Sequence, residues 1–253
     1  MPESPSTLAT TIPERLDDKT GIARTGAFLA VVVLVTIAAN LAAILAVGAT
    51  IGRDAGGTIT FIAGTIGTEL SFLLIGMAYL RVRSNFHLPL QIPSRTAVPY
   101  LLGGLLASFV TAFLSLAVTD AIVPAVELSP GYMEYSNLGG LTGFGLIFAV
   151  VLSLTVIGPV EEFFFRGVIQ GRLQVALGPR SAIGVASMTF ALFHVYPVAL
   201  LSPPGIVIAH MVVYYMFMGM IFGWVYRRTN TLIGPALVHG IFNAVIFSFP
   251  IWN

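Results

Sequence analysis

Seven stretches of the chain are each long and apolar enough to cross the roughly 30 Å hydrocarbon core of a bilayer as a helix. They cover residues 26–51, 58–80, 97–119, 141–165, 182–201, 206–226 and 231–251. The fourth stretch can continue as a helix to about Leu177, with its last turns amphipathic and lying at the interface, and that extension would count as a separate half-helix. The sequence therefore predicts an all-α polytopic membrane protein of seven to eight transmembrane helices.

The composition excludes a soluble protein. Of the 253 residues, 57% are hydrophobic and 9% are charged, whereas a soluble domain carries about 25% charged residues. The net charge of +1 says little about partners, and we expect contact with the lipid bilayer and none with nucleic acid. The chain has no cysteine, which excludes disulfides, thiolate zinc sites and a cysteine nucleophile.

The distribution of basic residues predicts the orientation. Residues 1–25 form a polar tail, and residues 26–253 form a single transmembrane domain. All but one of the 12 lysines and arginines fall on connections that alternate to the same side, with Arg53 the exception. The positive-inside rule then places the amino terminus in the cytosol, and an odd number of spans places the carboxyl terminus outside.

Two adjacent glutamates, Glu161 and Glu162, lie in the fourth apolar stretch. Residues 146–165 contain no other charge. An ionised carboxylate within a bilayer costs about 2.5–3.5 kcal/mol on insertion scales, so the default interpretation of such a residue is functional. Glu162 and Arg166 are four residues apart and share a helix face, whereas Glu161 points about 100° away. One glutamate can therefore pair with the arginine and the other can serve as a general base.

Two membrane histidines complete the candidate set. His194 lies about 18 Å along its helix if that helix begins near Ala182, which is close to the bilayer centre. His239 and Asn243 are four apart and can present donors to one point. The alternative interpretation is helix packing through polar side chains beside small residues. Together these groups are suited to hydrolysis by water, activated either directly or by a bound metal.

Three motifs in this set resemble those of a known family. Residues 161–166 (EEFFFR), 190–194 (FALFH) and 239–243 (HGIFN) are similar to the EExxxR, FxxxH and HxxxN motifs of the CPBP family. This family, also called Abi, contains CAAX proteases and bacteriocin-processing intramembrane peptidases. The motifs occur in the family's order, and the catalytic core would cover about residues 141–251.

The resemblance implies an intramembrane endopeptidase, similar to type II CAAX prenyl endopeptidases, with a site enclosed by membrane helices. It implies that Glu161 and His194 activate the water, that Glu162 holds Arg166, and that His239 and Asn243 stabilise the oxyanion. The implied partner is a membrane-associated peptide or protein, either prenylated or not.

A divalent metal is optional in this interpretation. Glu161, His194 and His239 could supply three ligands to a catalytic zinc, but the HExxH spacing of common zinc proteases is absent. We therefore favour catalysis by the glutamate, as a glutamic rather than a metallo-endopeptidase.

Two rival functions use the same residues. The carboxylates and histidines would also suit a proton- or cation-coupled transporter, and a membrane immunity or scaffold protein could keep the site without activity. The His239–Asn243 pair favours proteolysis, because only proteolysis needs an oxyanion site.

Some polar groups fit less well. Glu69 matches no motif, and packing against another helix is favoured over a place in the substrate path. For His210 we expect interfacial packing. Glu161 is predicted near the cytosolic end of its segment and His194 near mid-bilayer. For the two side chains to meet, the helices must tilt or the fifth must begin outside the bilayer, and a helix break at residues 158–159 would help.

Overall fold

The computed structural model describes residues 19–51, 56–82, 88–122, 141 and 143–252, and no strand occurs among them. The helices are α1 (Lys19–Ile51), α2 (Gly57–Val82), α3 (Val98–Ile122) after the short turn η1 (Arg95–Ala97), α4 (Phe144–Leu152), η4 (Ser153–Ile157), α5 (Gly158–Glu162), η5 (Phe163–Gln170), α6 (Gly171–Leu177), α7 (Pro179–Ala199), α8 (Gly205–Thr229) and α9 (Ile233–Trp252). The predicted tail falls largely outside the described residues, and α1 begins within it, at Lys19. Residues 123–140, in the connection between the third and fourth predicted spans, also lie outside them.

The helices confirm the predicted fold class. In the described part of the chain, six helical spans are long and apolar enough to cross a membrane, and a shorter apolar helix, Ile233–Ser248, follows them. The outer helices expose large apolar side chains, as lipid-facing helices do. On α3 these are Leu102, Leu106, Phe113 and Leu114. The chain is an integral membrane protein.

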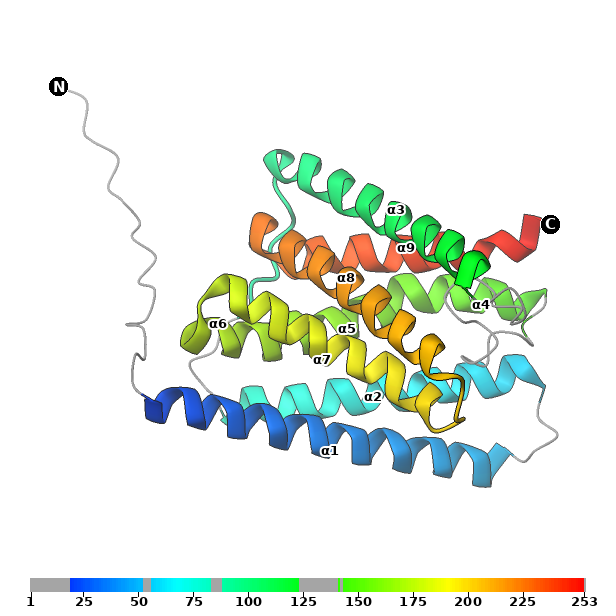
Figure 1. Ribbon diagram of the computed structural model, residues 1–253, viewed down its shortest axis with the longest axis horizontal. Coiled ribbons are helices and arrows are strands. Elements are labelled where there is room, and N and C mark those ends of the chain that lie inside the picture. The colour runs from blue at the N-terminus through cyan, green and yellow to red at the C-terminus, as the bar shows by residue number, and fades with distance from the viewer. Residues whose placement is uncertain (1–18, 52–55, 83–87, 123–140, 142, 253) are drawn as a thin grey trace.

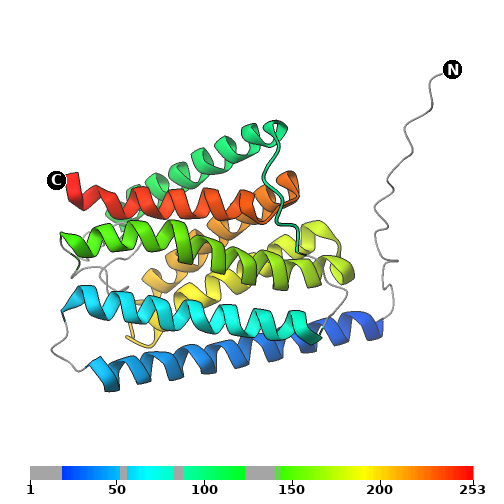
Figure 2. The ribbon, with the colours of Figure 1, turned by 180° about the vertical axis from the view of Figure 1, so that it is seen from behind.

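The helices run side by side along the long axis of the molecule (Figure 1). Seen from behind, α3, α9, the continuous rod α4–α6, α2 and α1 follow one another across the bundle (Figure 2). Helices α7 and α8 pack against each other and cover the other side of the rod. The beginning of α1, the α6–α7 turn and the end of α8 lie at one end of the bundle, which agrees with the charge pattern; the orientation itself stays a prediction.

The rod is a single span of 34 residues, Phe144–Leu177, that joins α4, η4, α5, η5 and α6. The predicted end at residue 165 was therefore too early, and the extension to Leu177 is confirmed. Pro159 does not break the rod. It lies in the first turn of α5, directly after the π-helical segment η4. A wider π turn accommodates the ring and the missing N–H of proline without ending the helix.

The α6–α7 hairpin brings Glu161 on the rod and His194 on α7 to the same height in the bundle. It turns at Gly178, whose φ of +76° is readily adopted by glycine. Glu161 lies 17 residues before this turn and His194 lies 16 residues after it. The predicted difference in depth was therefore wrong, because the helix of Glu161 continues well past residue 165.

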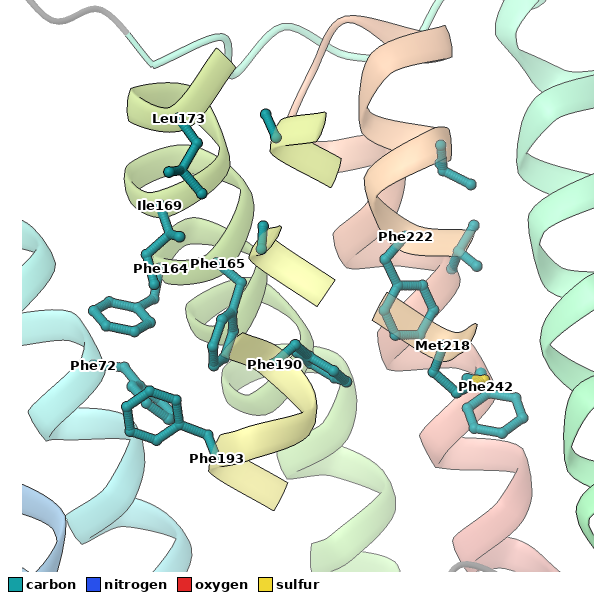
Figure 3. Close-up of a cluster of buried hydrophobic side chains, with 14 of the residues drawn as sticks. Phe72, Phe164, Phe165, Ile169, Leu173, Phe190, Phe193, Met218, Phe222 and Phe242 are labelled. Atoms are coloured by element: carbon teal, nitrogen blue, oxygen red, sulfur yellow. The ribbon is translucent and has the colours of Figure 1, made fainter. Parts of the chain in front are cut away.

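Aromatic side chains form the core beside the two glutamates. Phe164 and Phe165, which follow the glutamates, are fully buried against Phe72 of α2 and Phe190 and Phe193 of α7 (Figure 3). The Phe165 ring lies edge-on to those of Phe72, at 5.3 Å, and Phe190, at 5.1 Å. Edge-to-face pairs of this kind add about 0.5–1.5 kcal/mol each beyond area burial. The phenylalanines therefore continue the protein interior past the glutamates.

Candidate active site

Three parts of the chain supply the predicted site residues. The rod carries Glu161, Glu162 and Arg166, α7 carries His194, and α9 carries His239 and Asn243. Helix α9 packs against α4, η4 and α5, and α7 packs against η5. The site is therefore built where two other helices meet the middle of the rod.

Glu162 is fully buried and contacts two cationic or donor side chains. Its Oε2 lies 3.1 Å from Nε of Arg166, and its Oε1 lies 3.0 Å from Nδ1 of His239. The pairing with Arg166 is the one that the i, i+4 spacing predicts. The contact with His239 was not foreseen. Because the carboxylate accepts a hydrogen bond from Nδ1–H of His239, Glu162 fixes the imidazole of α9 to the rod.

Arg166 is a fully buried cation with several partners on α8. Its Nη2 donates to the carbonyl of Gly219 at 3.2 Å, and its guanidinium lies over the ring of Phe222 at 5.7 Å. One turn later, Gln170 donates to the carbonyl of Gly223 at 3.4 Å. A buried charge needs such pairing and hydrogen bonding to be tolerated. These contacts hold Arg166 against Glu162.

The α8 partners could have been found in the sequence. Gly219 and Gly223 form a GxxxG pattern (GMIFG), which allows close helix approach in membranes. A Cβ atom on Gly219 would lie 2.9 Å from Cα of Ser187 on α7. This approach also brings the α8 backbone within reach of Arg166 and Gln170.

His194 faces Glu161. Its Nδ1 lies 2.9 Å from the carbonyl oxygen of Phe190, and since a carbonyl can only accept, Nδ1 carries the proton. The neutral ring then presents a lone pair at Nε2, which lies 3.8 Å from Oε2 of Glu161. This separation is too long for a direct hydrogen bond. The His194 side chain is 23% exposed, whereas those of Glu161, at 8%, and Glu162, at 0%, are both buried. Glu162 pairs with Arg166, and Glu161 faces His194. The two glutamates therefore differ in surroundings as the spacing predicts.

His239 and Asn243 lie along one face of α9. The His239 ring stacks on Phe222, with centroids 4.5 Å apart and planes 17° apart. Since Nδ1 donates to Glu162, the neutral ring has no proton on Nε2. Asn243 is half-buried and makes no hydrogen bond to another described residue. Its amide is thus not committed elsewhere within the part of the chain that the structure describes.

Glu69 of α2 is a neighbour of this site that matched no motif. It is buried, and its Oε2 has no hydrogen-bond partner among the described residues. It shares a helix face with Phe72 and Gly76, which pack on the phenylalanines of η5. Its carboxyl is close enough to Glu161 for their charges to interact. The favoured interpretation as a packing residue therefore omitted its closeness to the candidate site.

His210, by contrast, takes part in helix packing, and its predicted place at the membrane interface stays a prediction. It lies 3.1 Å from the hydroxyl of Ser115 and 3.4 Å from that of Thr119, which links α8 to α3.

Two π-helical segments, η4 and η5, flank the glutamates. Such segments occur often at functional sites because they shift the direction of side chains within a helix. No residue pattern in the sequence indicated them.

The donor arrangement does not fit the predicted metal ligands. Glu161 and His194 face each other, and the Nδ1–H of His239 is bonded to Glu162, which leaves Nε2 as the only ring nitrogen of His239 that could bind a metal. Among the described residues, no three His, Cys, Asp or Glu side chains converge as a metal site requires. No step of the chemistry below is therefore assigned to a metal.

Comparison with known proteins bears on the same part of the chain. Residues 143–245 match the family model described as Type II CAAX prenyl endopeptidase Rce1-like. No curated protein and no solved structure matches the chain. The match confirms the resemblance to the CAAX protease family over these residues, which include all six candidate residues.

Proposed function

We propose that this protein is an intramembrane endopeptidase in which Glu161 and His194 activate a water molecule to hydrolyse a peptide bond of a membrane-associated substrate. The observation that carries the proposal is the 3.8 Å separation of Glu161 Oε2 and His194 Nε2, both acceptors, beside the fully buried Glu162–Arg166 pair. The family model describes proteases, which supports the same reaction class.

The chemistry follows from the two acceptors. A water molecule that donates one hydrogen bond to Glu161 and one to Nε2 of His194 has its oxygen lone pairs free for attack on a carbonyl carbon. The proton that water loses passes to Glu161 and then to the leaving amine as the carbon–nitrogen bond breaks. The Nδ1–H bond to Phe190 keeps the imidazole in the accepting tautomer throughout.

The oxyanion needs donors, and we assign Asn243 first. Its amide is uncommitted among the described residues, and an oxyanion donor contributes about 3–4 kcal/mol to catalysis. His239 joins it through Nε2 only when both ring nitrogens are protonated, because Nδ1 serves Glu162. In this scheme Glu162 and Arg166 orient His239.

The substrate we propose is a CAAX-type peptide with a prenylated cysteine. Its support is the family model and the position of the site between apolar helices. A prenyl chain would partition into the same bilayer that holds the protein, so enzyme and substrate would meet in two dimensions.

Cleavage of a quenched fluorescent peptide, with and without a farnesyl-cysteine, tests the proposal. Wild type would be compared with Glu161→Gln and with Glu14→Gln, a matched change in the predicted tail. We expect cleavage by wild type and Glu14→Gln, and its loss in Glu161→Gln with unchanged folding. Undiminished cleavage by Glu161→Gln contradicts the mechanism. Absence of cleavage together with Glu161-dependent proton flux in liposomes would favour the transporter alternative.

A further inference from the structure

Two aromatic rings contact the imidazole of His194. The Phe190 ring lies 4.2 Å away with the planes at 37°, and the Tyr215 ring is stacked on it at 4.3 Å and 28°. The two aromatic rings are 6.4 Å from each other, so they contact the imidazole from different sides. His194 is therefore confined by rings as well as by its Nδ1–H bond.

The two rings differ in what they can fix. Phe190 lies one turn before His194 on α7, so it shares any movement of that helix. Tyr215 belongs to α8, so its contact with the imidazole links His194 to a second helix. Its phenol is also close enough to Glu161 for the two groups to interact electrostatically. Tyr215 thus stacks on one of the two groups that the proposed function assigns to water activation and lies within electrostatic range of the other.

The position of Tyr215 is itself well determined. Tyr214 packs on it edge-to-face at 5.0 Å and 70°. One turn further, α7 and α8 meet so closely that a Cβ atom on Gly219 would lie 2.9 Å from Cα of Ser187. Close packing of this kind resists small displacements. A ring held by α8 can therefore keep a ring on α7 in place.

The tautomer alone does not set the direction of Nε2. The bond from Nδ1 to a carbonyl fixes one atom of the imidazole, while rotation of the ring about its χ2 torsion is broad. A stacked ring restricts that rotation. Catalytic groups misplaced by about 1 Å can lose roughly 100-fold in rate, so this restriction matters for activity.

We propose that Tyr215 is a positioning residue of the active site, whose ring holds the His194 imidazole in the orientation that directs Nε2 toward Glu161. This inference rests on the proposed function for its consequence in catalysis, but the restraint on His194 can be tested without any substrate. The ring carries the effect, so Tyr215→Phe keeps it and Tyr215→Leu removes it.

The first test observes the imidazole by ¹⁵N NMR on the full chain in nanodiscs with labelled histidine. The His194→Gln variant identifies the His194 signal. We expect the dipolar order parameter of the His194 Nδ1–H bond to be near the rigid limit in wild type and Tyr215→Phe, and clearly lower in Tyr215→Leu, where the ring is free to rotate about χ2. An equally rigid His194 ring in Tyr215→Leu would overturn the proposal. Phe61→Leu, a buried ring in a separate core cluster, controls for loss of a core ring.

The second test measures cleavage kinetics of the same variants. We expect kcat of Tyr215→Leu to fall by about 10- to 100-fold with KM within about twofold, while Tyr215→Phe and Phe61→Leu stay near wild type. An equal loss in Tyr215→Phe and Tyr215→Leu would overturn the role of the ring, as would a normal kcat in Tyr215→Leu. If wild type cleaves no peptide, the proposed function fails, and the NMR result still decides the restraint.

Discussion

Gly158 of α5 lies against Gly240 of α9 so closely that a Cβ atom on Gly158 would come 2.9 Å from the Gly240 nitrogen. The same Cβ would also come 2.9 Å from the carbonyl oxygen of Ala236. These are backbone atoms, which cannot rotate away. The contact sets how near α9 approaches the rod, and so it sets the distance from Glu162 to His239. Glu162 lies one turn after Gly158 on the rod, and His239 directly precedes Gly240 on α9.

Replacing Gly158 with alanine should therefore separate α5 from α9. We expect Gly158→Ala to lower the free energy of unfolding by about 1–3 kcal/mol, as overpacking does, and to reduce peptide cleavage. Thermal unfolding in detergent and the cleavage assay check this. Gly184→Ala on α7 is the matched control, since no atom lies within 4 Å of its added Cβ. Equal stability of the two variants would contradict the role of the Gly158 contact.

Substitution by glutamine should lower the stability of the protein more at Glu162 than at Glu161. Glu162→Gln leaves Arg166 buried without its carboxylate, and breaking a buried ion pair costs about 3–5 kcal/mol. Glu161→Gln removes only a group that lies 3.8 Å from His194, so the unfolding midpoint should stay near that of wild type. Both variants should lose cleavage. A lower midpoint in Glu161→Gln than in Glu162→Gln would contradict this division.

A double substitution separates the charge from the packing. In Glu162→Gln with Arg166→Gln the uncompensated cation is gone, so part of the lost stability should return. Strict additivity of the two single effects would show that the two side chains do not act as a pair.

Substitution by alanine should affect activity at Asn243 and stability at Asn40. Asn243 makes no hydrogen bond to another described residue, whereas Asn40 is buried and contacts Ser71 of α2 and Tyr196 of α7. We expect Asn243→Ala to lower kcat by about 100-fold or more with little change in unfolding. Asn40→Ala should lower stability by about 1–3 kcal/mol, because it leaves buried partners unpaired. Kinetics and thermal unfolding of both variants check the contrast, and it fails if Asn243→Ala is the less stable protein.

The sequence predicted the parts of this site that lie within one helix. The i, i+4 spacing gave the Glu162–Arg166 pair and the shared face of His239 and Asn243. It could not give the contact between Glu162 and His239, because that contact depends on which helices pack together. Helix periodicity identifies an apolar or small-residue face but not its partner.

The length of the rod shows a similar limit. The charges of Arg166 and Arg172 favoured an end near residue 165, where hydropathy falls. The structure instead buries Arg166 among aromatic rings, and the rod continues to Leu177. The charge of Arg166 is therefore accommodated by contacts with other helices and not by water at a helix end. The closeness of Glu69 to Glu161 was missed for the same reason, since it depends on where α2 packs.

Metal removal provides the last prediction. The predicted zinc ligands are Glu161, His194 and His239, but no three His, Cys, Asp or Glu side chains among the described residues converge as a metal site requires. We therefore expect a strong chelator to leave the wild-type cleavage rate within about twofold, because the glutamate and the imidazole can accept the protons of water directly. The assay compares untreated, chelated and zinc-restored protein with the same peptide. Loss of cleavage on chelation with recovery on added zinc would contradict the expectation.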